Sequence, residues 1–300
     1  MTFWGELPQG PEMLLGEPLS VELLYDRDAP ADQLTAVFPA EEPWEALSVV
    51  RVFHEGKLLF GGIVDEQNAV LSESGLQVEL VCRSWEALLL DNEAQPAVLR
   101  SPSLEALWEK YLKPLGLAGY AGEKGAQTGE MTVEKGMSCW EVLEGFCQDY
   151  LGVSPWVDSS GMLHCESLPE SRVEAGPVLW AEFSLLPCKQ LSTVWQQSYR
   201  GTYDTPFRGG ASLGIQRQRY VSMEDGRDPR ALLQEGQQES RLLIVECPGL
   251  HWPARGALAS GQAGPLGRFV DLPVRAARYT RNSRGERTRL TLEGGTGSCG

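Results

Sequence analysis

A glycine–serine motif is the pattern in this chain that comes nearest to an active site. Gly210-Ala-Ser-Leu-Gly214 has the spacing G-x-S-x-G, in which a serine nucleophile sits on a sharp strand-to-helix turn and an acid and a histidine follow later in the chain. The next segment, Ile215 to Val221, is typical of a strand, and no alternation of strands and helices surrounds it. We therefore expect a glycine-rich loop with an incidental serine. Hydrolysis through Ser212, with His251 as its partner, remains an alternative.

Histidines and cysteines bind metals when they are paired at short spacing, and in this sequence they are scattered. The histidines His54, His164 and His251 are isolated from one another and from the cysteines. No C-x-x-C pair occurs among the seven cysteines, which are Cys82, Cys139, Cys147, Cys165, Cys188, Cys247 and Cys299. Most cysteines have apolar neighbours, so we expect buried, reduced thiols. The sequence predicts no metal site and no cofactor.

Acidic residues are plentiful enough to supply a carboxylate pair for glycoside cleavage, but their separation in space decides that chemistry. Asp65-Glu66 and Asp91-Asn92-Glu93 fall at the ends of predicted elements, where acidic side chains cap the backbone or face solvent. A cell-wall hydrolase built on such a pair remains an alternative. Our expectation is that the chain has no catalytic residues.

A strand, a glycine turn and a capped helix are predicted over Met131–Gly152. Ser138-Cys-Trp-Glu141 has the S-x-x-E spacing of a capping box, and an apolar helix face follows it. The segment 131–152 resembles a LysM repeat, a module that binds N-acetylglucosamine chains. That resemblance implies peptidoglycan or chitin as a ligand, with Trp140 and Trp156 as sugar contacts. Alternatively, both tryptophans anchor the core of a scaffold domain, which is the interpretation we favour.

Three regions differ in their predicted elements. Residues 1–97 are expected to be all-β apart from a helical turn near Trp85, with strands at Ser20–Tyr25, Leu34–Phe38, Leu47–His54, Leu58–Val64 and Leu76–Cys82. Residues 98–170 are predicted to form a small α+β unit, with a helix capped by Ser103. Residues 171–300 return to β, with one helix opening at Asp228-Pro229 and a flexible, glycine-rich C-terminal tail. Six strands are predicted there: Val178–Ser184, Leu191–Tyr199, Ile215–Ser222, Leu242–Glu246, Phe269–Tyr279 and Arg287–Leu292.

Composition and charge are those of a folded protein whose two ends differ in sign. Hydrophobic residues make up 42% and charged residues 22% of the 300. Residues 1–97 hold 18 acidic against 4 basic side chains, 98–170 hold 11 against 5, and 171–300 hold 12 against 17. This asymmetry favours docking between opposite surfaces over nucleic-acid binding, which needs a concentrated basic patch. No apolar run of about 18 residues and no signal-peptide pattern occurs, so we expect no membrane insertion and synthesis in the cytoplasm.

The most informative stretch is Leu58–Pro96. It predicts a strand, a Gly61-Gly62 kink, a second strand, a turn at Ser74-Gly75, a third strand, and an amphipathic segment with Trp85, Leu88 and Leu89 on one face. The text GGIVDE, followed by CRSWEALLLDNEA, resembles the first domain of baseplate hub proteins of contractile phage tails, tailocins and related contractile injection systems. Cys82 stands where that family commonly has glycine, so the chain departs from the family pattern at this position.

The resemblance implies a β-rich α+β chain, with two tube-type β-barrel-like domains (1–97 and 171–300) and an inserted small α+β domain (98–170). It implies a structural, non-enzymatic hub: a homotrimeric ring that joins the tail tube to the central spike. Baseplate wedge or LysM-type adaptor proteins would be further partners. DNA would meet the ring only in transit, past an acidic channel wall that repels it. The expected location is the tail baseplate of a virion or injection particle, assembled in the host cytoplasm. Trp4 and Trp252, beside glycine and proline in loop-like text, are candidate interface residues.

Overall fold

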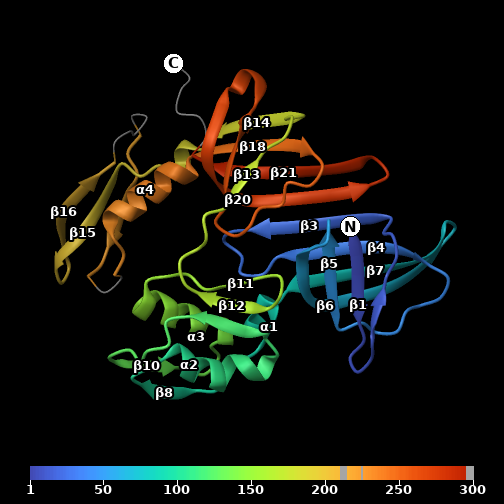
Figure 1. Ribbon diagram of the computed structural model, residues 1–300. Helices are drawn as coiled ribbons and strands as arrows, with labels where there is room; N and C mark the ends of the chain where they lie inside the picture. Colours follow the sequence, from blue (N-terminus) through green and yellow to red (C-terminus); the bar gives the residue numbers. More distant parts are fainter. Residues whose placement is uncertain (210–214, 224–225, 295–300) are drawn as a thin grey trace. The chain divides into compact units, whose positions relative to one another are not determined.

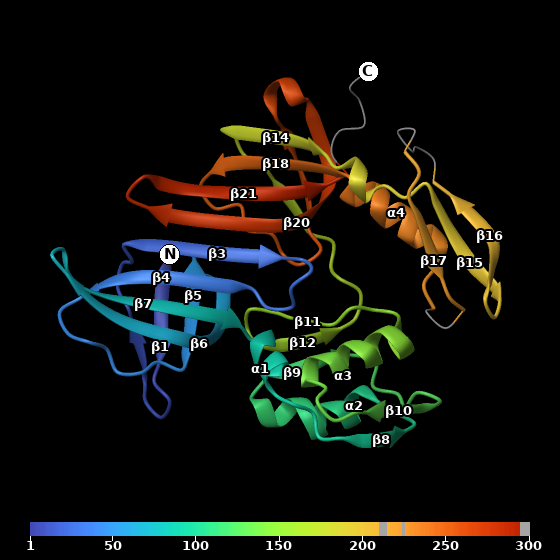
Figure 2. The ribbon, with the colours of Figure 1, turned by 180° about the vertical axis from the view of Figure 1, so that it is seen from behind.

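The computed structural model describes residues 1–209, 215–223 and 226–294 (Figures 1 and 2). The chain forms two compact units: unit 1 comprises residues 1–169 and 278–286, and unit 2 comprises the remainder. Strands dominate both units, which confirms the prediction of a β-rich α+β fold. The motif Gly210–Gly214 and nearly all of the glycine-rich C-terminal tail lie outside the described residues.

Unit 1 begins with a sheet of seven strands, each antiparallel to its neighbours, in the order β3-β4-β7-β6-β5-β1-β2 (Figure 1, blue to cyan). The predicted strands of residues 1–97 are all present, and β1 and β2 add to them. The bounds are β1 Thr2–Glu6, β2 Glu12–Leu14, β3 Ser20–Asp26, β4 Gln33–Ala40, β5 Val49–His54, β6 Lys57–Ser72 and β7 Gly75–Ser84.

Alternation of apolar and polar residues explains this sheet. Buried and partly exposed residues alternate along β3, β4 and β7, so one face of each strand faces the core. Phe3 and Phe38 meet edge to face, with ring centroids 5.4 Å apart, and Leu23, Leu34 and Leu80 are fully buried around them. Such aromatic and aliphatic burial provides most of the stabilisation of a sheet of this kind.

The predicted division into two strands at Gly61-Gly62 is wrong. Lys57–Ser72 is one continuous strand, and its register is irregular at Leu59, before the glycines, and between Val64 and Glu66, after them. Gly61 and Gly62 lie inside this strand. Neighbouring backbone approaches both positions closely, which explains why they are glycine. The turn at Ser74-Gly75 is confirmed, with Gly75 at φ +103°.

The rest of unit 1 is a small α+β part that follows β7 through helix α1, Glu86–Asp91. In Figure 2, helices α2 and α3 lie on one side of the three-stranded sheet β11-β12-β9. A two-stranded sheet pairs β8 with β10. The bounds are β8 Ala97–Arg100, α2 Leu104–Leu107, β9 Gly119–Gly122, β10 Glu130–Val133, α3 Cys139–Phe146, β11 Trp156–Val157 and β12 Met162–Cys165.

Both predicted helix caps are present in this part. Ser103 accepts a hydrogen bond from Ala106 N at 3.1 Å, and Ser138 and Glu141 form the complete capping box. Each helix continues into a wider π-helical turn, η1 Trp108–Leu112 after α2 and η3 Cys147–Leu151 after α3. The apolar faces of both helices belong to one buried core cluster, which includes Leu104, Leu143 and Phe146.

Unit 2 carries a second sheet, in the order β14-β18-β21-β20, with β19 on β20 and β13 on β19 (Figure 2). Helix α4 packs against a small sheet, β16-β15-β17, and Asp228 caps its start by accepting from Arg230 N at 2.9 Å. The bounds are β13 Arg172–Glu174, β14 Trp180–Leu185, β15 Thr193–Tyr199, β16 Thr202–Arg208, β17 Gln218–Val221, α4 Pro229–Glu239, β18 Arg241–Pro248, β19 Leu258–Gln262, β20 Arg268–Asn282 and β21 Gly285–Glu293. All six predicted strands are present, whereas β13, β16 and β19 were not predicted.

Candidate functional site

A joint of buried polar contacts fixes the α+β part of unit 1 to its seven-stranded sheet. Glu86, only 2% exposed, accepts a hydrogen bond from the backbone N–H of Val157 at 3.1 Å and from the Ser84 hydroxyl at 2.6 Å. The indole N–H of Trp85 donates to the carbonyl of Ser159 at 3.0 Å. Because a buried carboxylate is costly without donors, these contacts hold the two parts of unit 1 in one geometry.

Two glycines make the joint possible. A Cβ on Gly61 would lie 2.2 Å from the carbonyl oxygen of Ser159, and a Cβ on Gly62 would lie 2.0 Å from that of Arg83. Both distances are far shorter than van der Waals contact. Glycine is therefore required at both positions by the approach of neighbouring backbone.

Charged side chains close the outer side of the joint. The Arg83 guanidinium donates to both oxygens of Asp65, at 2.5 and 3.0 Å, and to Asp91 at 2.6 Å. These hydrogen bonds, first to Asp65 and then to Asp91, raise the pKa of Arg83 above its ordinary value. Arg83 and Asp91 belong to the CRSWEALLLDNEA text, and Asp65 belongs to the GGIVDE text.

A second polar cluster lies in the turn before β12. Asp158 accepts from Ser160 Oγ at 2.6 Å, from Met162 N at 3.1 Å and, through its second oxygen, meets Nε2 of His164 at 3.2 Å. The His164 ring stacks on Trp156, with centroids 4.1 Å apart. Partial burial raises the pKa of Asp158, but the hydrogen bonds from Ser160, Met162 and His164 outweigh it and hold that pKa below its ordinary value.

Asp158→Asn is expected to destabilise the protein at pH 7, because the amide forms weaker hydrogen bonds with Ser160 and Met162. The pKa of Asp158 is lower in the folded protein than in the unfolded chain. The carboxylate therefore contributes stability at pH values above its unfolded-state pKa, and this contribution is lost as the pH falls through the folded-state pKa. The difference in melting temperature between wild type and variant should therefore shrink below about pH 3.9, the ordinary aspartate pKa. Thermal melts from pH 7 to pH 3 test this, with the exposed Asp149→Asn as control. A pH-independent difference would contradict it.

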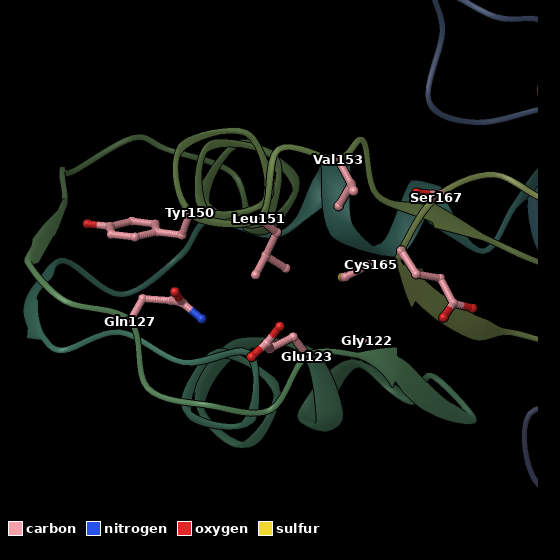
Figure 3. Close-up of a pocket in the computed structure, with 9 residues that line it drawn as sticks. Gly122, Glu123, Gln127, Tyr150, Leu151, Val153, Cys165 and Ser167 are labelled. Carbon is pink, nitrogen blue, oxygen red and sulfur yellow. The ribbon is translucent and has the colours of Figure 1, made fainter.

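A groove of about 550 Å³ opens beside the helices of the α+β part (Figure 3). In the close-up, Glu123 and Gln127 from the loop after β9 face Tyr150 and Leu151 of η3 across it. The full lining is Gly122, Glu123, Gln127, Tyr150, Leu151, Val153, Cys165, Glu166 and Ser167. The groove is polar and open, and neither Trp140 nor Trp156 belongs to its lining.

The structure places the two candidate sugar contacts apart from this groove. Trp140, only 6% exposed, lies in the core between the helices. Trp156 is half-buried and stacks on His164. Both positions agree with the alternative in which these residues are core anchors, and a sugar would reach Trp140 only if the core opened. The LysM-like character of segment 131–152 stays a prediction.

The two candidate interface residues lie in different units. Trp4, on β1, is half-buried and pairs across the sheet with Leu14 of the edge strand β2. Trp252, in the segment between β18 and β19, is half-buried as well. Other apolar side chains are more exposed: Leu71 near the end of β6 at 79%, Leu179 just before β14 at 56%, and Leu185, the last residue of β14, at 58%. No local pattern indicates these three residues, because their exposure depends on which strands end the sheet.

Other chemical candidates are not assembled into a site. Ser212 lies outside the described residues. Within the described ranges, no group of three His, Cys, Asp or Glu is placed to hold a metal ion. Cys82, Cys139, Cys147, Cys165 and Cys247 are buried free thiols, and Cys188 is exposed. No helix in the described part of the chain is long and apolar enough to span a membrane.

Solved structures share this fold over nearly the whole chain. A tail protein from Neisseria meningitidis matches with a TM-score of 0.71 and 17% identity, over 97% of this chain and 95% of that one. The 43 kDa tail protein of a Shewanella oneidensis prophage matches with a TM-score of 0.78 and 14% identity, over 97% of both chains. A component of the Escherichia coli type VI secretion system, described as similar to bacteriophage tail proteins, matches with a TM-score of 0.56 and 11% identity, over 92% of this chain and 73% of that one. No protein-family model and no curated protein matches the sequence.

The chain thus has the fold of phage tail proteins and of their relatives in type VI secretion. This confirms, at the level of the fold, the resemblance to baseplate proteins of contractile injection systems that Leu58–Pro96 indicated. The residues that carried the resemblance lie at the joint, where Arg83, Trp85 and Glu86 make the contacts described above.

Proposed function

We propose that this protein is a structural baseplate hub at the tip of a contractile tail. Three copies form a ring that joins the tail tube to the central spike, and the protein has no catalytic role. The observation that carries this proposal is the match over 97% of the chain to two phage tail proteins. A chain in each of three PdpA–VgrG complexes, two of them from Francisella, matches with TM-scores of 0.53 to 0.56 over 52–64% of that chain, which supports a spike-containing assembly as the setting.

The geometry suits a mechanical part. In the joint of unit 1, Glu86 accepts a hydrogen bond from the backbone N–H of Val157, and in the turn before β12 Asp158 accepts one from Met162 N, so both carboxylates serve local structural contacts. A ring subunit needs large, stable interfaces, of the order of thousands of Å². Trp4 and Trp252 are proposed as interface residues, and wedge or LysM-type adaptor proteins as further neighbours. The particle is a virion tail or a related injection device, and DNA passes the ring only in transit.

The mass of the purified protein in solution tests the proposal. We expect light scattering to give three times the subunit mass of 33.0 kDa for the protein alone, or that mass plus the mass of the bound spike after a spike protein is added. A stable monomer under both conditions would contradict the hub. If that monomer bound chitin oligosaccharides or peptidoglycan, the LysM-type module would replace the hub as the function, and cell-wall cleavage would instead indicate a hydrolase.

A further inference from the structure

The sheets of the two units repeat one strand order. Five strands of unit 1 run in the order β3-β4-β7-β6-β5, and five of unit 2 run β14-β18-β21-β20-β19. In both sheets the third and fourth strands form a long hairpin, β6–β7 or β20–β21. The repeat ends at the next strand, since β1 is antiparallel to β5 whereas β13 is parallel to β19.

The register of the strands repeats residue by residue. Leu19 N donates to Val37 O at 2.7 Å, and Leu179 N donates to Glu246 O at 2.8 Å. In the same register Glu22 pairs with Thr35 on β4, and Glu182 pairs with Ile244 on β18. Glu22 therefore corresponds to Glu182.

The two hairpins also correspond. Ser72-Glu-Ser-Gly75 and Asn282-Ser-Arg-Gly285 form their turns, with the glycine at φ +103° and +105°. Seven residues after the glycine stand Cys82 and Leu292, which pair with Leu34 and Leu243 on the neighbouring strands. Counting back from the glycines, Asn68 corresponds to Arg278 and Leu71 to Arg281.

One of these hairpins has its partner within the chain. Residues 278–286 belong to unit 1, where Arg278 donates to Glu22 of β3 at 2.6 Å and Arg281 bonds Glu17 just before β3. The end of β20 thus contacts the region of β3 through two ion pairs.

The corresponding end of β6 has no such partner in the described chain. Strand β5 pairs with β6 only as far as Ile63, and the Gln67 side chain bonds the segment 44–47. Beyond it, Asn68–Ser72 are all exposed, and none of the described strands pairs with their outer edge. The strand that corresponds to β3 is β14, which is also an edge strand, with Leu179, Trp180 and Leu185 exposed along it. Open edges of this kind pair with another chain.

We infer that Asn68–Ser72 of one copy docks against β14 of a second copy, in the way that the end of β20 contacts the region of β3. The inference rests on the ring proposed above. The correspondence places Asn68 opposite Glu182, where the amide donates to the carboxylate. It places Leu71 opposite Pro177, beside Leu179, where an apolar contact replaces the Arg281–Glu17 ion pair. Each copy offers a hairpin and receives one, which is a head-to-tail contact that closes a ring.

Cross-linking between two chains that each carry one introduced, exposed cysteine tests this contact. The chains carry Asn68→Cys and Glu182→Cys, each in a Cys188→Ser, Cys299→Ser background, and are mixed and treated with a short bismaleimide. The remaining native thiols are buried, and burial raises the pKa of Cys82 to about 12, so they react slowly. We expect a covalent dimer from the mixture and none from either chain alone.

Two controls separate the possible failures. A single chain with Glu22→Cys and Arg278→Cys should cross-link internally, which consumes both thiols without doubling the mass. A mixture of Glu105→Cys with Glu182→Cys should give no dimer, because the correspondence assigns Glu105 no place near β14. A trimer by light scattering that shows no Asn68–Glu182 dimer, while the internal control reacts, overturns this contact and leaves the hub standing. A protein that stays monomeric overturns both.

Discussion

Gly61→Val is expected to detach the segment 156–165 from the first sheet of unit 1. The new side chain would collide with the carbonyl of Ser159, which lies 2.2 Å from an ideal Cβ at this position. Overpacking of this kind costs about 1–3 kcal/mol, and the buried Trp85 N–H that loses the same carbonyl adds about 1–3 kcal/mol. We expect the melting temperature of the protein to fall by roughly 10 °C.

Hydrogen exchange locates the effect. In Gly61→Val, the amides of Val157 and Met162 should exchange much faster than in the wild type, because the joint holds β11 and β12 in place. Gly125→Ala is the matched control, since a Cβ there would meet only the carboxylate end of Glu123, at 3.5 Å. Unchanged exchange at Val157 in the valine variant would show that Ser159 shifts without loss, and the joint would then not require glycine at position 61.

Elements with local signals could be predicted from the sequence. Buried and partly exposed residues alternate along β3 and along β7 from Gln77 to Arg83, and the α3 capping box has its partners three residues apart. The tight turn at Glu55-Gly56, between the predicted strands Leu47–His54 and Leu58–Val64, is local in the same sense, and both of its residues have positive φ. Each of these signals lies within a few residues of the element that it specifies.

Elements that depend on distant partners were missed. Strands β1 and β13 are short and are strands only because β5 and β19 lie beside them. The Gly-Gly pair suggests a kink because glycine, which lacks a side chain, allows backbone conformations that other residues avoid. It does not show that Ser159, far along the chain, approaches Gly61. Long-range approach is a property of the fold, and a local pattern does not contain it.

The contacts of the joint also depend on residues that are far apart in the sequence, and a local pattern did not indicate them. The sequence text around Arg83, Trp85 and Asp91 indicated the right class of fold, yet it assigned no role to Glu86, which is among the few buried charged residues in the described chain. A glutamate at the start of a helix is usually an exposed capping residue. Only the position of the Val157 backbone N–H shows that this glutamate points inward.

Glu86→Leu is accordingly expected to destabilise the protein strongly, although leucine fills a similar volume. The substitution removes the acceptor of the buried Val157 N–H and of the Ser84 hydroxyl. A buried donor without an acceptor costs about 1–3 kcal/mol, and the part-buried Ser84 hydroxyl adds about 1 kcal/mol, so the free energy of unfolding should fall by roughly 2–4 kcal/mol. Urea denaturation, with the midpoint and slope compared with those of the wild type, measures this loss.

Two further variants show whether the hydrogen bonds carry the effect. Glu86→Gln keeps one carbonyl oxygen for Val157 and a polar group for Ser84, so it should lose much less stability than Glu86→Leu. Glu134→Leu changes an exposed glutamate in the same way and should leave the midpoint unchanged. If Glu86→Leu were as stable as the wild type, burial of apolar surface would outweigh the lost acceptor, as occurs when buried charges are replaced by well-packed hydrophobic groups. The joint would then owe its stability to Trp85 and the glycines.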